Sequence, residues 1–159
     1  MKQRFVTGNR VELLECGREY FPALLAAIEG ATKEVHLESY IFEPDDTGRV
    51  VAAALAAAAR RGVAVRVLVD GFGARDFPRE FGGTLQASGA QVLVYRPEVA
   101  ALRLRRNRLR RLHRKLVVID AGIAFIGGIN VIDDMDTPGQ TPPRYDYAVR
   151  VAGPLLADI

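Results

Sequence analysis

Three apolar segments in the last third of the sequence lie too close together for helices to connect them. They are His113–Asp120, Ala124–Val131 and Tyr145–Val151, and each has the length and β-branched content of a strand. Parallel strands need a crossover, commonly a helix, whereas a short turn and a polar loop over Asp133–Arg144 join these segments. We therefore expect three antiparallel neighbours in one sheet.

The first two thirds of the sequence alternate between strand and helix patterns. We expect strands at Arg10–Glu15, Lys33–Phe42, Val63–Asp70 and Gln91–Tyr95, helices at Arg18–Gly30 and Val50–Arg61, a loop over Glu43–Gly48 and a short helical piece at Thr84–Ser88. Alternation of this kind predicts partly parallel strands covered by helices. The expected fold is α/β, a mixed parallel and antiparallel sheet flanked by helices, in a single domain over residues 1–159.

Composition narrows the class of protein. The chain has 159 residues, of which 49% are hydrophobic and 26% charged, as in one compact domain. Cys16 is the only cysteine, which excludes an internal disulfide and, with two histidines, argues against a Cys/His zinc site. The longest apolar run, Val50–Ala59, is shorter than the ~20 residues that span a bilayer. We expect a cytoplasmic protein without metal or cofactor, peripheral on the inner membrane face.

Positive charge is concentrated in one short stretch. The net charge is +3, yet Arg103–Lys115 holds eight Lys and Arg residues and no acid, which leaves the rest of the chain at −5. Such a block attracts a polyanion, and the attraction weakens with salt. The arginines expected to contact an anionic surface are Arg103, Arg105, Arg106, Arg108, Arg110 and Arg111.

Two kinds of polyanion fit this block. Leu102, Leu109 and Leu112 recur at about helical spacing among the arginines, which suits a helix lying on an anionic membrane. Nucleic acid is the alternative. The stretch lacks aromatic residues that would stack on bases, although duplex binding through phosphates needs none.

A histidine followed two residues later by a lysine is the strongest candidate for chemistry. Strand alternation places His113 and Lys115 on one face. An imidazole can attack phosphorus as a nucleophile, and an ammonium group neutralises phosphoryl oxygens as charge develops. The pair therefore predicts phosphodiester chemistry, with Lys115 as a phosphate ligand.

The following segments supply further candidates. Gly128 leaves backbone amides open to a ligand, and Asn130 adds a neutral donor, so both are expected to bind phosphate. A nucleophilic imidazole also needs a proton held on its other nitrogen, usually by a carboxylate. Asp146 is the candidate for that role. Asp120 has the opposite strand parity and lies near the Gly122 turn, so it is either a turn anchor or a further member of the catalytic set.

Two other acidic residues are possible pocket residues. Glu38 shares a strand face with His36 and Tyr40, which indicates either a polar sheet surface or part of the pocket. Asp70 ends a strand before Gly71, where it either begins a turn or borders a ligand crevice.

The motifs together resemble a known family. His-x-Lys-x4-Asp from His113, followed by Gly-Gly-x-Asn, is similar to the signature of the phospholipase D superfamily. The stretches Leu37–Phe42, Leu68–Gly71 and Asp146–Val149 are similar to the N-terminal half of bacterial cardiolipin synthases. The resemblance runs from about residue 8 to the end.

The resemblance implies a site built from two such motifs, without a metal. One histidine forms a phosphohistidine, the other serves as acid and base, and a carboxylate near Asp146 contacts the histidine. It also favours anionic phospholipid over nucleic acid as the partner. This sequence has one motif, so the second comes either from a homodimer mate or from the missing half of a longer enzyme. We favour the missing half, because Ala152–Ile159 resembles a helix that has just begun.

Three functions are compatible with this sequence. The leading one is a cardiolipin synthase-like phosphatidyltransferase. The second is a homodimeric nuclease of the same superfamily. The third is a catalytically silent half that binds only a membrane or its partner half.

Overall fold

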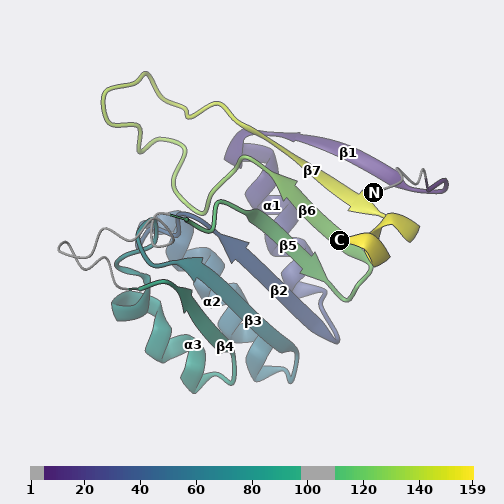
Figure 1. Cartoon of the computed structure of the whole chain (residues 1–159), viewed down its shortest axis with the longest axis horizontal. Helices are drawn as coiled ribbons and strands as arrows, with labels where there is room; N and C mark the ends of the chain where they lie inside the picture. The colour runs from purple at the N-terminus through teal and green to yellow at the C-terminus, as the bar shows by residue number, and fades with distance from the viewer. Residues whose placement is uncertain (1–5, 98–109) are drawn as a thin grey trace.

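A seven-stranded mixed sheet organises the described residues, 6–97 and 110–159, of the computed structural model (Figure 1). The strand order is β1-β7-β6-β5-β2-β3-β4. The strands are β1 (Arg10–Glu15), β2 (Glu34–Ser39), β3 (Ala64–Asp70), β4 (Gln91–Tyr95), β5 (Lys115–Ile119), β6 (Ile123–Gly127) and β7 (Tyr147–Ala152). The helical elements are α1 (Cys16–Glu29), α2 (Asp46–Arg60) and α3 (Gly83–Ala87), with short turns η1 (Pro78–Gly82) and η3 (Pro154–Asp158).

The predicted mixed topology is confirmed. β2, β3 and β4 are parallel, whereas β5, β6 and β7 are antiparallel neighbours. The last three strands differ from prediction at their ends. β5 begins at Lys115 instead of His113, and β6 ends at Gly127 instead of Val131. β6 ends early because the chain beyond it turns to the loop after β2, where Val131 bridges Phe42.

Helix α2 begins four residues before the predicted start at Val50, so the predicted loop over Glu43–Gly48 is too long. Asp45 has an extended backbone, and its side chain accepts a hydrogen bond from the Gly48 amide. This N-cap gives a partner to an amide that the first helical turn cannot satisfy. At the other end Gly62 has a φ of 91°, the left-handed conformation in which glycine commonly ends a helix.

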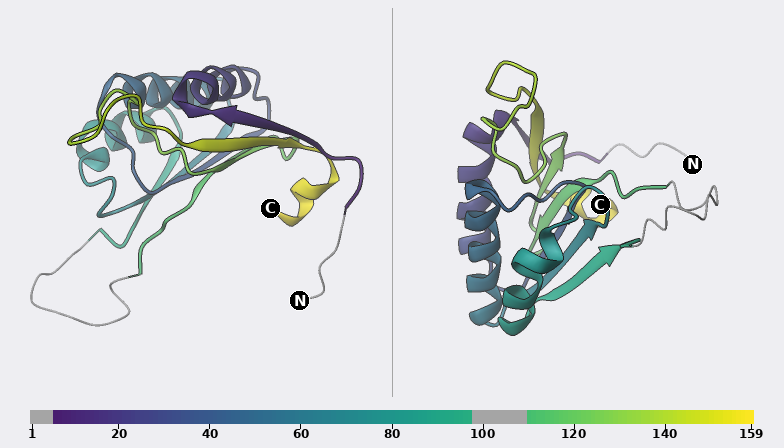
Figure 2. Two further views of the ribbon diagram at one scale, coloured as in Figure 1. Left: turned by 90° about the horizontal axis from the view of Figure 1, so that it is seen from above. Right: turned by 90° about the vertical axis from the view of Figure 1, so that its left-hand side faces the viewer.

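The long helices pack together on one face of the sheet (Figure 2). Alternate residues of β2 and β5 point towards them and are buried. The resulting core joins both layers through Leu24, Ile28, Val35, Leu37, Val51, Leu55, Val117 and Ile119. Within the described ranges, every helix is too short or too polar to cross a membrane.

Among residues 6–97 and 110–159, the chain after β7 doubles back over the other face of the sheet. Gly153 has a φ of 122°, a conformation that favours glycine, and the chain then forms η3 beside β7 (Figure 2). The amide of Leu155 donates to the side chain of Asn9 at 2.8 Å. Ala124, Val151 and Leu156 are buried on this side, which gives the sheet a small second apolar cluster.

Strand pairing brings distant parts of the chain to one edge of the sheet. Ser39 at the end of β2 pairs with Lys115 at the start of β5. Gly127 at the end of β6 pairs with Ala148 near the start of β7. Because these neighbours run in opposite directions, the end of one strand lies beside the beginning of the next. This edge, called the site edge below, therefore gathers residues that are far apart in the sequence.

Asp120 lies at the opposite edge, which corrects the alternative that it belongs to the catalytic set. It occupies the turn between β5 and β6 together with Ala121, at φ values of 52° and 49°. Its carboxylate accepts hydrogen bonds of 2.8–2.9 Å from the amides of Thr32, Lys33 and Glu34 and from the Thr32 hydroxyl. Asp120 thus anchors the turn between α1 and β2. Burial raises the pKa of Asp120, but these hydrogen bonds outweigh it and lower the pKa to about 2.

Removing this carboxylate should destabilise the fold. We expect Asp120→Ala to lower the free energy of unfolding at pH 7 by about 2 kcal/mol, since backbone amides lose a charged acceptor. The folded pKa lies below the unfolded value of about 3.9, so the stabilisation is present above about pH 4 and is lost as the pH falls towards 2. Urea unfolding should therefore show a smaller gap between wild type and variant at about pH 2.5 than at pH 7.

A variant in the same turn provides the control. Ala121→Gly leaves the carboxylate in place and relieves a left-handed alanine, so it should add about 1 kcal/mol of stability at both pH values. A gap between wild type and Asp120→Ala that does not change with pH would contradict the anchoring role.

Candidate active site

His113 and Lys115 meet at the site edge. The Nζ atom of Lys115 lies 3.2 Å from both ring nitrogens of His113, although His113 precedes β5 instead of lying within it. Tyr40 joins them, with its ring centre 4.7 Å from that of His113 and 5.4 Å from Nζ. The strand pattern of the sequence predicts only a polar sheet face for Tyr40. No local pattern indicates this contact, because it depends on the pairing of β2 with β5 in the folded sheet.

Lys115 is buried to a degree unusual for a lysine. Only 9% of it is exposed, on the helix-covered side of β5. Burial disfavours the charged ammonium and lowers the pKa of Lys115, while the carboxylate of Asp146 partly opposes this shift. An ammonium with little hydration interacts strongly with a nearby anion. Lys115 is therefore well placed to hold a phosphoryl oxygen.

Asp146 packs directly over Gly128. A Cβ atom on residue 128 would overlap the carboxylate of Asp146, so the close approach requires glycine at this position. Oδ1 of Asp146 accepts a hydrogen bond of 2.7 Å from the Tyr147 amide, and its backbone oxygen accepts one of 2.8 Å from Cys16. Among the described residues no hydrogen bond joins Asp146 to His113, so its orienting role stays a prediction.

Asn130 belongs to the loop after β6 and holds the loop after β2. Its Oδ1 accepts a hydrogen bond of 3.0 Å from the Ile41 amide. Backbone hydrogen bonds continue this contact, from Val131 to Ile41 and from Glu43 to Val131. This contact uses the oxygen of the Asn130 amide and leaves its nitrogen, a hydrogen-bond donor, as the group that would reach a phosphate.

Asp70 is completely buried, and its carboxylate accepts hydrogen bonds from three backbone amides. Oδ1 accepts from Phe72 at 2.8 Å and Gly73 at 3.2 Å, and Oδ2 accepts from Leu112 at 2.8 Å. Leu112 directly precedes His113, so this carboxylate ties the histidine segment to the end of β3. Of the two interpretations of Asp70, the structure favours the turn, with a link to the site through the backbone.

The remaining candidates flank the pair. Glu38 is half-buried on the sheet face opposite the helices and forms an ion pair of 3.2 Å with Arg114. It therefore supports the residue between His113 and Lys115. Arg110 is exposed and Arg111 half-buried. The rest of the predicted arginine block lies outside the described residues: Arg103, Arg105, Arg106 and Arg108.

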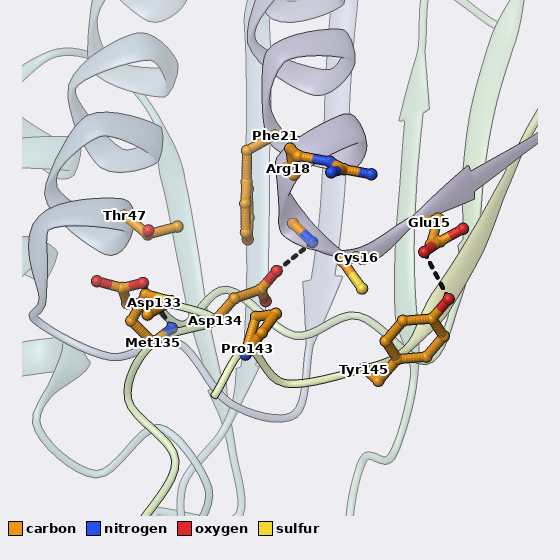
Figure 3. A pocket seen from close by; sticks show the side chains of 11 residues that line it. Glu15, Cys16, Arg18, Phe21, Thr47, Asp133, Asp134, Met135, Pro143 and Tyr145 are labelled. Carbon is orange, nitrogen blue, oxygen red and sulfur yellow. Dashed lines mark hydrogen bonds between the residues drawn. The ribbon is translucent and has the colours of Figure 1, made fainter. Parts of the chain in front are cut away.

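A cavity of about 520 Å³ is lined in part by Cys16 and Tyr145 (Figure 3), and the Cys16 amide donates to the backbone oxygen of Asp146. It lies between the start of α1, the loop after β6 and the residues before β7, and Phe21 and Met135 supply part of its apolar wall. In Figure 3 the Gly17 amide donates to the carboxylate of Asp134, and the Tyr145 hydroxyl donates to Glu15. His113 and Lys115 are not among the lining residues, so the cavity lies beside the pair.

This arrangement provides the groups that the cleavage of a phosphodiester bond requires. An exposed imidazole, a buried ammonium and a side-chain amide gather at one edge of the sheet, and together they suit nucleophilic attack on phosphorus with charge neutralisation. Within residues 6–97 and 110–159, no three His, Cys, Asp or Glu residues are grouped so that they could hold a metal ion.

Comparison with known protein families gives a match over most of the chain. The family model described as "Cardiolipin synthase, PLD-like domain" matches residues 24–135. This range includes His113, Lys115 and Asn130. The chain is 44% identical over its whole length to cardiolipin synthase B of Escherichia coli strain K12, and it spans 38% of that protein. It is also 38% identical to the major cardiolipin synthase ClsA of Bacillus subtilis over 131 residues. This aligned region covers 82% of this chain and 27% of that protein.

Solved structures confirm the fold class. Nuc, a phospholipase D family member from Salmonella typhimurium, superposes with a TM-score of 0.66 at 20% identity, over 95% of this chain and 88% of that one. Phosphatidylserine synthase from Haemophilus influenzae superposes with a TM-score of 0.63 at 12% identity, over 98% and 38% of the two chains. At these identities the likeness concerns the fold alone.

The ammonium of Lys115 should titrate below the ordinary lysine pKa of about 10.4, because burial is the main cause of its shift. Asp146→Asn removes the opposing carboxylate and should lower the pKa of Lys115 further. Carbon-13 NMR of the lysine Cε resonances against pH measures both values, and Lys115→Met identifies the resonance. A pKa that is unchanged or higher in Asp146→Asn would contradict the proposed electrostatics.

Asp70→Asn should loosen the segment that carries His113. Asparagine keeps one acceptor oxygen but cannot accept a second amide at its nitrogen, so the Leu112 bond is lost. Hydrogen exchange of the Leu112 amide should quicken at least about tenfold, and that of Gly73 should change less. Turnover should also fall about tenfold or more through misplacement of the imidazole. Unchanged exchange at Leu112 would contradict the positioning role.

Proposed function

This chain belongs to the cardiolipin synthase family of phospholipase D-like domains, and we propose that it forms one half of a phosphatidyltransferase active site. The contact between His113 and Lys115, 3.2 Å from Nζ to the ring nitrogens, is the observation that carries this proposal. Across this distance one phosphodiester could contact both the imidazole and the ammonium group, which supports the proposal.

The proposed reaction has two balanced steps. In the first, a ring nitrogen of His113 attacks the phosphorus of a phospholipid phosphodiester, and the bond from phosphorus to the leaving alcohol breaks as that alcohol takes up a proton. In the second, the hydroxyl of an acceptor alcohol or phospholipid attacks the phosphohistidine. The bond between phosphorus and nitrogen breaks, and the acceptor gives up its proton. A second histidine would supply and remove these protons.

The other site residues have supporting roles in this proposal. Lys115 and the amide nitrogen of Asn130 would hold the phosphoryl oxygens, and the backbone at Gly128 would allow their close approach. Asp146, beside Lys115 and Gly128, would hold the proton on the second nitrogen of His113 once substrate is bound.

The second histidine must come from elsewhere. The sequence contains only His36 and His113, and His36 binds Glu34 and Arg66 at 3.0 and 2.9 Å on the sheet face away from the helices. A second copy of the chain, or a second half of a longer enzyme, would provide the partner motif. The chain spans 38% of the length of cardiolipin synthase B of Escherichia coli, and this fact supports the second source.

A homodimeric nuclease is the second candidate. The observation that favours it is the superposition on Nuc, a chain of similar extent, of which 88% is covered. The same residues would then attack a nucleic acid phosphodiester, with two copies sharing one site. A half that binds phosphodiesters without turning them over is the third candidate.

One paired assay separates these candidates. We expect the chain, supplied with its partner motif, to transfer phosphatidyl groups from phosphatidylglycerol, and His113→Ala to reduce this at least about a thousandfold because the nucleophile is lost. His36→Ala is the matched control and should retain most activity. Cleavage of plasmid DNA that depends on His113 would support the nuclease and contradict phosphatidyl transfer.

The mass of the particle in solution tests the shared site. An active preparation of the chain alone should be dimeric, with a specific activity that rises with concentration, since each site needs two motifs. A monomer that is fully active would contradict the shared-site mechanism.

A further inference from the structure

An aromatic side chain between two arginines lies beside the site, where β3 ends. Phe72 follows Asp70 and Gly71 and is 46% exposed. The guanidinium carbons of Arg75 and Arg111 lie 5.5 and 5.1 Å from the centre of its ring, within the range of cation–π contact. Phe72, Arg75 and Arg111 come from two separate segments, and we call them the Phe72 cluster.

The Phe72 cluster carries positive charge without carboxylate partners among the described residues. Arg75 and Arg111 form no ion pair there, and Nη1 of Arg111 is buried without an acceptor. The nearby acids Asp76 and Glu80 are both paired with Arg79, at 3.1 and 2.8 Å. Apart from this buried nitrogen, no carboxylate among the described residues competes with an external anion for the two guanidinium groups.

Asp70 fixes this cluster relative to the candidate site. Its carboxylate accepts hydrogen bonds from Phe72 and from Leu112, and Leu112 lies between Arg111 and His113. A surface that binds Phe72 and Arg111 is therefore held in a defined position relative to the imidazole.

We propose that the Phe72 cluster is a docking surface for an anionic lipid bilayer. Phe72 would enter the boundary between headgroups and acyl chains, and the arginines would lie among the headgroup phosphates. Aromatic side chains favour that boundary, and each basic residue near an anionic surface strengthens binding by about fivefold. The inference rests on the proposed phospholipid substrate, since docking here would bring headgroup phosphodiesters to His113.

Charge and apolar exposure together favour a bilayer over a soluble anion. A free phosphate would use the arginines but gain nothing from the exposed phenyl ring. Both features strengthen binding to a bilayer, because the ring leaves water while the cations remain at the headgroups.

Vesicle co-sedimentation tests the docking surface directly. The 159-residue chain is mixed with vesicles of phosphatidylcholine containing phosphatidylglycerol, and with phosphatidylcholine vesicles alone. We expect Phe72→Ala and Arg75→Gln each to weaken binding to the anionic vesicles about fivefold. Added salt should reduce the arginine contribution.

Matched controls come from surfaces far from the site. Leu13 is 63% exposed on the edge strand β1, and Arg60 is exposed at the end of α2. Leu13→Ala and Arg60→Gln should leave vesicle binding within about twofold of wild type. Equal losses in controls and cluster variants, or no loss in the cluster variants, would overturn the proposal.

Two further measurements separate this inference from its rivals. Stronger binding to duplex DNA than to anionic vesicles, weakened by the same two variants, would overturn the lipid assignment in favour of nucleic acid. Activity is measured separately on a soluble phosphodiester, without vesicles, with the chain supplied with its partner motif. If wild type shows no turnover there while Phe72→Ala and Arg75→Gln still lose vesicle binding, the proposed function fails and the docking surface stands.

Discussion

An ammonium group buried at the end of an apolar strand is the feature on which the candidate site depends. Lys115 continues the inward-facing series of Val117 and Ile119 on β5, so the strand places a charge where the core would accept only an apolar side chain. Such a charge needs nearby partners. Tyr40, His113 and Asp146 provide them, and each comes from a different part of the chain.

The strand directions make this gathering possible. Neighbouring strands among β2, β5, β6 and β7 are antiparallel. The end of β2, the start of β5, the end of β6 and the start of β7 therefore lie at the same edge of the sheet, and these strand ends carry the polar residues. Gly128 then allows the Asp146 carboxylate to approach the backbone. The same alternation places Asp120 at the other edge, although it follows Lys115 by one short strand. There its charge holds the start of β2 instead of a substrate.

Local sequence patterns were sufficient to predict much of the fold and part of the candidate site. The remaining features depend on tertiary contacts. The mixed sheet could be predicted, because the short spacing between the last three apolar segments leaves no room for crossover helices. The contact between His113 and Lys115 could also be predicted, because the two residues are separated by only one residue. The early start of α2 could not, because it depends on the side chain of Asp45 as a cap. Nor could the contacts of Tyr40 with His113 or of Asp70 with Leu112, since both join segments that only the folded sheet brings together.

Binding of a phosphoryl mimic, followed through the two histidines, tests the central claim most directly. Titration of the chain with tungstate or vanadate, monitored by NMR of the imidazole resonances, should shift His113 and leave His36 as an internal reference on the other sheet face. Lys115→Met should abolish the His113 response, because the buried ammonium is the principal anion ligand in this account. Saturable binding that shifts only His36, or that persists in Lys115→Met, would contradict a phosphodiester half-site built on His113 and Lys115.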